Sequence, residues 1–211
     1  MQRTLIKICG ITRAEDAQAA VGLGANALGF VFYPPSVRYV DIDQAARLVK
    51  GVPPFVTRVG LFVNPDAASV RATLAAVDLD LLQFQGDESA DFCRQFARPY
   101  IKVARMRPGI DLIEFARSYP DSRGLLLDTY VEDFGGAGRS FDWTMIPTDL
   151  TVPIVLAGGL TAANVGEAIR RIRPAGVDVS SGVEAAKGIK DPHKIAAFVA
   201  AVKNADDPTN L

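Results

Sequence analysis

The feature that most constrains the fold is an eightfold alternation of short apolar runs with longer amphipathic segments. The apolar runs are rich in aliphatic and β-branched residues and predict strands at residues 4–9, 27–32, 56–63, 81–86, 100–105, 124–129, 153–159 and 176–182. Seven of the segments between or after them have the apolar spacing of a helix: 13–23, 41–51, 65–77, 89–97, 110–119, 161–172 and 191–204. The stretch "FDWTMI", after the sixth run, is a poorer helix.

Strands that are apolar throughout and alternate with helices are typical of a parallel sheet covered by helices. Eight repeats favour a single closed (β/α)8 barrel, which we expect over residues 1–205, with a flexible tail over 206–211. The 211 residues are few for this fold, so the loops must be short. An open, doubly wound sheet is the alternative that periodicity alone leaves open.

The charge pattern favours a small-molecule partner. The chain has 23 Lys and Arg against 24 Asp and Glu, a formal net charge of -1, and no block of like charge. Such a balance provides no basic face for nucleic acid or an anionic membrane. The apolar run at the N-terminus is too short for a signal peptide, and no segment approaches the roughly 18 apolar residues of a membrane span. We therefore expect a cytoplasmic protein.

Cysteine and histidine are scarce. Cys9 and Cys93 are the two cysteines, and Cys93 lies within a helical pattern, which indicates a reducing compartment rather than a disulfide framework. The single histidine, His193, opens the last helical segment, where we expect a surface or capping role. A dedicated transition-metal site is not expected, although Mg²⁺ held by carboxylates is harder to exclude.

Polar residues at strand ends are the candidates for chemistry, because active sites of barrels lie where strands end. Cys9 ends the first strand, where a cysteine is usually a small buried hydrophobe. Lys7 shares a strand face with Cys9, and an ammonium beside a thiol favours the thiolate. Asp128 closes "GLLLDT" and either caps a turn or, if buried, has the raised pKa of a general acid.

Two glycine-containing loops predict a phosphate site. Gly158 and Gly159 lie between a buried strand and a helix, where backbone N–H groups favour an anion. The loop after the eighth strand offers similar chemistry, and together the two loops match the phosphate-binding type of barrel. The phosphate-binding candidates are Gly136, Gly138, Gly158, Gly159, Ser180, Ser181 and Gly182, of which Gly136 and Gly138 lie in a run that is also usual in flexible loops.

Arg38 lies in the loop after the second strand, which Pro34 and Pro35 make stiff. It is either a solvated surface arginine or a fork that binds a substrate carboxylate at two points.

Taken together, the motifs resemble the phosphoribosylanthranilate isomerase family of the tryptophan pathway. The matching stretches are "KICGIT", "LGFVFYPPSVRYV", "RVGLFVN", "LLLDT", "GGAGRSFDW", "LAGGLTAANV" and "DVSSGVE" followed by "KGIKD". They run colinearly from residue 5 to about residue 191, which is far more specific than any single motif.

The resemblance implies an Amadori rearrangement of N-(5-phosphoribosyl)anthranilate to 1-(2-carboxyphenylamino)-1-deoxyribulose 5-phosphate, without a metal or an organic cofactor. It places the family's cysteine base on Cys9, its general acid on Asp128 and its anthranilate-binding arginine on Arg38. The strand-eight aspartate falls on Asp178, a substrate-binding residue, and the phosphate cradle falls on the loops named above. We expect a monomer or a homodimer.

One position departs from the family pattern. The family commonly has "QLHG" after the fourth strand, whereas this chain has "QFQG", with Gln85 at the usual histidine position. Glutamine hydrogen-bonds but does not titrate, so Gln85 can orient a substrate but cannot transfer a proton.

Two other functions compete with this one. Another phosphosugar barrel is possible, but epimerases of that kind use metal-binding histidines, and an indole-glycerol-phosphate synthase has an N-terminal extension absent here. A non-catalytic phosphosugar-binding module is the second alternative, and retention of Cys9 and Asp128 argues against it.

The two catalytic candidates also imply a pKa pattern. A thiol and a carboxyl with ordinary pKa values are almost never thiolate and neutral acid together at pH 7. We therefore expect the site to lower the pKa of Cys9, through Lys7 if that side chain points into the barrel, and burial and Asp178 to raise the pKa of Asp128.

Overall fold

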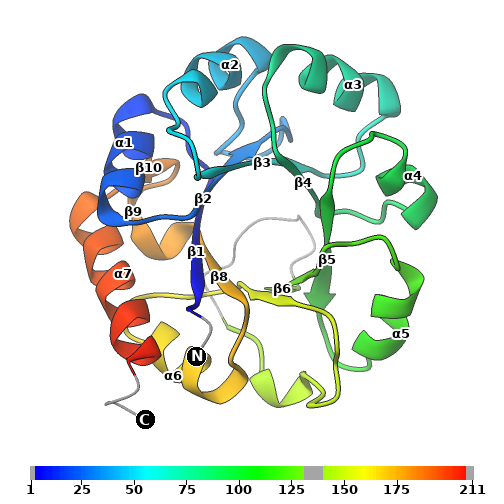
Figure 1. Cartoon of the computed structure of the whole chain (residues 1–211), viewed down its shortest axis with the longest axis vertical. Helices are drawn as coiled ribbons and strands as arrows, with labels where there is room; N and C mark the ends of the chain where they lie inside the picture. Colours follow the sequence, from blue (N-terminus) through cyan, green and yellow to red (C-terminus); the bar gives the residue numbers. More distant parts are fainter. Residues whose placement is uncertain (1–2, 131–139, 208–211) are drawn as a thin grey trace.

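The computed structural model describes residues 3–130 and 140–207. In this part of the chain, eight parallel strands close into a barrel in sequence order, with the last strand pairing with the first (Figure 1). The strands are β1 Leu5–Cys9, β2 Ala27–Val31, β3 Thr57–Phe62, β4 Leu81–Phe84, β5 Tyr100–Met106, β6 Leu125–Thr129, β7 Ile154–Leu156 and β8 Gly176–Val179. The predicted closed barrel is confirmed, and the open sheet is wrong.

Helices surround the barrel where the amphipathic segments predicted them (Figure 1). They are α1 Ala14–Leu23, α2 Ile42–Lys50, α3 Ala67–Ala76, α4 Ala90–Arg94, α5 Leu112–Ser118, α6 Val165–Ile172 and α7 Pro192–Asp206. Five of them are preceded by a capping residue whose side chain accepts hydrogen bonds from backbone N–H groups of the first turn. The five capping residues are Asp41, Asp66, Ser89, Asp111 and Asp191. Between β6 and β7, "FDWTMI" forms only the short 3₁₀ turn η1, Trp143–Met145.

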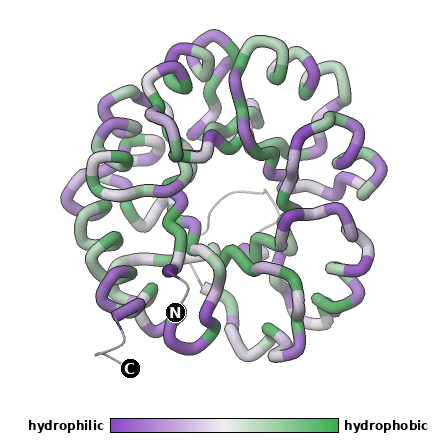
Figure 2. Tube along the Cα trace, viewed as in Figure 1, coloured by the Kyte–Doolittle hydropathy of each residue, from purple (hydrophilic) through white to green (hydrophobic). Residues whose placement is uncertain are grey.

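Strand alternation divides the apolar residues into two layers. Outward residues such as Ile8, Phe30 and Leu127 pack under the helices in one large core. Inward residues such as Val103 and Leu126 fill the barrel itself. Figure 2 shows the strands around the centre as largely hydrophobic, while the helices alternate between hydrophilic and hydrophobic positions. This double burial explains why the strand segments are apolar on both faces.

A short hairpin follows β8 and lies beside the mouth of the barrel. It consists of the 3₁₀ turn η2, Ser181–Val183, and the antiparallel strands β9, Glu184–Ala186, and β10, Ile189–Lys190. Its Glu184 side chain contacts Arg38 in the loop after β2.

The described chain ends beside its beginning. Asp206, the last residue of α7, accepts hydrogen bonds from the backbone nitrogen and the hydroxyl of Thr4, at 2.8 and 2.6 Å. Asp206 lies one residue beyond the expected end of the barrel domain, and residues 208–211 lie outside the described residues. No helix among the described residues has the length and apolar character needed to cross a membrane.

Candidate active site

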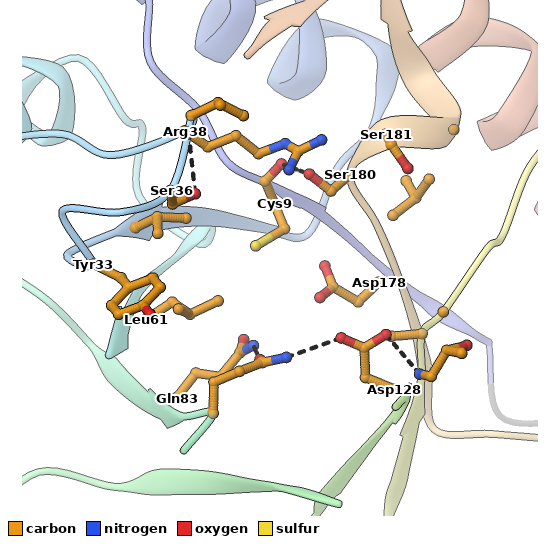
Figure 3. Close-up of a pocket in the computed structure, with 18 of the residues that line it drawn as sticks. Cys9, Tyr33, Ser36, Arg38, Leu61, Gln83, Asp128, Asp178, Ser180 and Ser181 are labelled. Atoms are coloured by element: carbon orange, nitrogen blue, oxygen red, sulfur yellow. Dashed lines mark hydrogen bonds between the residues drawn. The ribbon is translucent and has the colours of Figure 1, made fainter. Parts of the chain in front are cut away.

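A cavity of about 500 Å³ opens at the carboxyl ends of the strands (Figure 3). Ten of the predicted site residues line it: Cys9, Arg38, Gln85, Asp128, Gly158, Gly159, Asp178, Ser180, Ser181 and Gly182. The remaining two, Gly136 and Gly138, lie outside the described residues. The barrel thus brings together Cys9 on β1, Asp128 on β6 and Asp178 on β8, although Cys9 is more than a hundred residues from the other two in the sequence.

A buried ion pair lies beside the thiol. The Lys7 ammonium contacts the Asp178 carboxylate at 2.9 Å, and both side chains are less than a tenth exposed. Lys7 pairs in register with Asp178 on β8, and Cys9 lies two residues further along the same inward face. Burial alone would lower the pKa of Lys7, but the charges of Asp178 and Cys9 raise it above its ordinary value.

The predicted lowering of the Cys9 pKa is wrong, although Lys7 acts in the predicted direction. Burial raises the pKa of the Cys9 thiol above its ordinary value, and Lys7 only partly opposes this while Asp178 adds to it. Since the ammonium is already paired with Asp178, its field at the sulfur is partly cancelled. Burial therefore favours the neutral form of the Cys9 thiol.

The predicted effect on Asp128 is confirmed. Burial raises the pKa of Asp128 to about 6, the Gln85 hydrogen bond opposes the shift, and the charge of Asp178 adds to it. The Asp128 carboxylate accepts from Gln85 Nε2 at 2.9 Å and from the backbone nitrogen of Thr129 at 2.8 Å. A carboxyl with a pKa near 6 is neutral in about a tenth of molecules at pH 7.

The Arg38 guanidinium is not the free fork that the sequence predicted. Its Nε and Nη2 donate to the two carboxylate oxygens of Glu184 in the hairpin, at 2.7 and 2.8 Å. Lys190 Nζ also contacts Glu184, at 2.9 Å. Burial would raise the pKa of Glu184, but Arg38 and Lys190 hold it below its usual value. A ligand carboxylate therefore meets the remaining edge of Arg38 or displaces Glu184.

The two phosphate-site loops lie together at the cavity wall. Gly158 and Gly159 have φ values of +78° and +62°, a conformation that favours glycine. The Ser180 hydroxyl, a predicted phosphate donor, donates instead to the carbonyl oxygen of Cys9 at 3.0 Å. That bond ties the loop after β8 to the end of β1.

Sequence reasoning missed three side chains at or behind the cavity wall. Gln83 lines the cavity beneath Gln85, and the spacing of two residues on one strand was the available signal. Lys187 lines the rim from the hairpin, and Glu184 holds Arg38. Both lie in stretches that the family resemblance covered, but nothing in local spacing distinguishes them. Within residues 3–130 and 140–207, no group of three or more histidine, cysteine, aspartate or glutamate side chains is arranged to hold a metal ion.

Comparison with known proteins agrees with this geometry. The family model described as N-(5'phosphoribosyl)anthranilate (PRA) isomerase matches residues 6–201. The chain belongs to this isomerase family. An N-(5'-phosphoribosyl)anthranilate isomerase from Dechloromonas aromatica (strain RCB) is 63% identical over 205 residues, covering 97% of this chain and 99% of the relative.

Solved structures of the family share the whole barrel. One is a phosphoribosyl anthranilate isomerase in complex with reduced 1-(o-carboxyphenylamino)-1-deoxyribulose 5-phosphate, with a TM-score of 0.85, 41% identity, and coverage of 95% of this chain and 98% of that one. Another is a monomer generated from the dimeric family member of Thermotoga maritima, with a TM-score of 0.83, 37% identity and the same coverage.

Proposed function

We propose that the protein catalyses the Amadori rearrangement of N-(5-phosphoribosyl)anthranilate to 1-(2-carboxyphenylamino)-1-deoxyribulose 5-phosphate, a step of tryptophan biosynthesis. One observation carries the proposal: a single cavity holds a carboxyl with a pKa of about 6 and a buried thiol, next to glycine loops suited to a phosphate. Family membership supports the same substrate.

Asp128 acts as the general acid in this proposal. Opening the furanose ring requires a proton at the ring oxygen, and the neutral form of Asp128 supplies it. Because burial raises its pKa, the protonated form is about a hundred times more abundant at pH 7 than for an ordinary aspartate. The Gln85 amide then stabilises the carboxylate that remains, through its bond to Asp128 Oδ2.

Cys9 acts as the base. Ring opening leaves an iminium, which acidifies the neighbouring sugar carbon, and the Cys9 thiolate removes the proton from that carbon. The resulting enolamine tautomerises to the ketone. The positive charge of the iminium, added to that of Lys7, favours the thiolate once the furanose ring has opened. The raised pKa of Cys9 makes the thiolate a minor form of the free protein, and the charge of the iminium then stabilises that form.

Different residues of the cavity wall bind the two charged groups of the substrate. The glycine loops and Ser181 receive the phosphate, and Lys187 at the rim adds a positive charge. Arg38, which lies near Ser180 and is bonded to Glu184 in the hairpin, receives the anthranilate carboxylate. Asp178 contacts the substrate while it holds Lys7.

A steady-state assay tests this function. With N-(5-phosphoribosyl)anthranilate as substrate, we expect turnover in the presence and absence of a chelator, and a loss of about a hundred- to ten-thousandfold in kcat for Cys9→Ser or Asp128→Asn. Tight substrate binding without turnover would instead indicate a non-catalytic binding module. Loss of activity with the chelator would favour a metal-dependent phosphosugar enzyme.

The proposal also covers the partners, location and assembly of the protein. We propose a small phosphoribosyl substrate, no nucleic-acid partner, a cytoplasmic location and a monomer or homodimer. Sedimentation velocity over a hundredfold range of concentration distinguishes the two assembly states.

A further inference from the structure

The side chain of Gln83 has a feature that neither the fold nor the proposed mechanism explains. It is 1% exposed, and its Oε1 has no hydrogen-bond partner among the described residues. On the neighbouring strands its register partners are Leu61 and Ile101, which offer no polar side-chain atoms. Buried carbonyl oxygens are usually satisfied, so an unpaired one indicates a missing donor. Gln83 lines the cavity, where Figure 3 shows it on the side of Asp128.

The other end of the Gln83 amide begins a directed chain of hydrogen bonds. Gln83 Nε2 donates to Gln85 Oε1 at 2.9 Å, and Gln85 Nε2 donates to Asp128 Oδ2 at 2.9 Å. Each amide presents its oxygen on one side and its nitrogen on the other, so one orientation fixes the next. The chain therefore runs from the unpaired oxygen of Gln83 to the carboxyl of the proposed acid.

We propose that Gln83 is a substrate-binding residue whose Oε1 accepts a hydrogen bond from a sugar hydroxyl of the bound phosphoribosyl compound, and that this contact fixes the Gln85 amide toward Asp128. This inference rests on the proposed function. A hydroxyl is the fitting group, because the phosphate and the carboxylate of the ligand only accept hydrogen bonds at neutral pH, whereas an opened pentose carries several hydroxyl donors.

The hydroxyl contact has a consequence for the acid. When Oε1 of Gln83 accepts the sugar hydroxyl, neither amide group can rotate to exchange its oxygen and nitrogen. Gln85 must then donate to Asp128 Oδ2. The proton of neutral Asp128 is then excluded from the Gln85 side and remains available to the substrate. Without the contact, Gln85 is free to turn and accept that proton, which favours the protonated carboxyl.

The binding test uses Gln83→Met, which keeps the side-chain length and removes both polar atoms, with Gln18→Met on the exposed face of α1 as the matched control. The probes are reduced 1-(2-carboxyphenylamino)-1-deoxyribulose 5-phosphate, which has the hydroxyls, and inorganic phosphate, which lacks them. We expect Gln83→Met to weaken the first about 3- to 10-fold and phosphate less than 2-fold, as for loss of one hydrogen bond. Gln18→Met should change neither.

Equal weakening of both probes, or no weakening of either, overturns the hydroxyl contact. Since these measurements need no turnover, they remain decisive even if the parent protein proves inactive in the assay, an outcome that would instead refute the proposed function.

The coupling to Asp128 has its own readout, the pH dependence of kcat. Among the described residues, the charged groups that face Asp128 are Asp178 and Lys7 across the barrel and Arg105 in register on β5, with the Cys9 thiol nearby. Gln83→Met leaves all four in place. We expect the acidic limb of its profile to move to higher pH, because Gln85 becomes free to accept the Asp128 proton. An unchanged limb together with weakened binding of the reduced product overturns the coupling.

Discussion

At the scale of single residues, the site depends on how burial competes with charge. Lys7 lies close enough to Cys9 to stabilise a thiolate, yet the pKa of the thiol is raised because burial outweighs an ammonium that already serves Asp178. Among residues 3–130 and 140–207 no cation is bonded to Asp128, and burial raises its pKa to about 6. Burial therefore shifts the pKa of both proposed catalytic groups upward, toward the neutral form.

This bias predicts the pH profile of kcat/KM. The proposed mechanism needs neutral Asp128 and ionised Cys9. Because the pKa of Asp128 lies below that of Cys9, the pair holds its single proton mainly on Cys9. The active form, with the proton on Asp128, is therefore the minor one. The population of this form decreases at pH values below the lower pKa and above the higher pKa, so the profile is bell-shaped. We expect an acidic limb near pH 6 and an alkaline limb above the ordinary pKa of a thiol.

Initial rates between pH 5 and pH 10 measure this profile. His193 is exposed and lies in the first turn of α7, so His193→Gln serves as the control and should keep both limbs. An alkaline limb well below the ordinary thiol pKa, or a limb lost in His193→Gln, contradicts the assignment.

At the scale of elements, the end of β4 is held from outside the barrel. Lys102 on β5 donates to the carbonyl oxygens of Phe84 and Gly86, at 3.3 and 2.5 Å, and pairs with Glu88 at 2.8 Å. The other carboxylate oxygen of Glu88 accepts from the backbone nitrogens of Asn64 and Gly86. The bonded carbonyls flank Gln85, so this buried network fixes the backbone that presents Gln85 to Asp128.

Removal of Lys102 should destabilise the fold and loosen the site. In Lys102→Met the Glu88 carboxylate is left buried without its cation, and we expect the free energy of unfolding to fall by about 3–5 kcal/mol. Urea denaturation followed by circular dichroism measures the loss, and kcat should fall because Gln85 is displaced. Lys50→Met, on the exposed end of α2, should change the free energy of unfolding by less than about 0.5 kcal/mol. Equal stability of the two variants would refute a structural role for this network.

At the scale of the whole molecule, the barrel closes by joining the two ends of the described chain. β1 pairs with β8, and Asp206 at the end of α7 bonds the backbone and the hydroxyl of Thr4 just before β1. The last helix therefore holds the first strand at the point where the ring is completed, on the side opposite to the cavity.

Removal of the hydrogen bonds between Asp206 and Thr4 should lower the stability of the fold without changing catalysis. For Asp206→Ala we expect a fall of about 1.5–3 kcal/mol in the free energy of unfolding, the usual contribution of hydrogen bonds to a charged group, with kcat within twofold of the parent. Thermal unfolding and the steady-state assay measure the two effects. Asp149→Ala, which removes an exposed carboxylate, is the matched control. A drop in kcat as large as the drop in stability would show that the closure also shapes the active site.

The sequence by itself determined the architecture and the position of the two catalytic candidates. Apolar runs alternating with helical spacing predict a barrel because each strand must be buried on both faces. Parallel strands then bring their carboxyl ends to one side, so residues at those ends, such as Cys9 and Asp128, meet whatever their distance in the sequence. Both inferences use only local periodicity and one rule of topology.

Only the tertiary structure decided how these residues interact. Glu184 occupies the Arg38 fork from 146 residues away, and Asp178 neutralises Lys7 from 171 residues away. The same holds for the pKa of Cys9 and for the unpaired oxygen of Gln83, which depend on how completely neighbouring strands exclude water. Desolvation and long-range pairing are properties of the assembled barrel, and the spacing of residues along one strand carries no information about them.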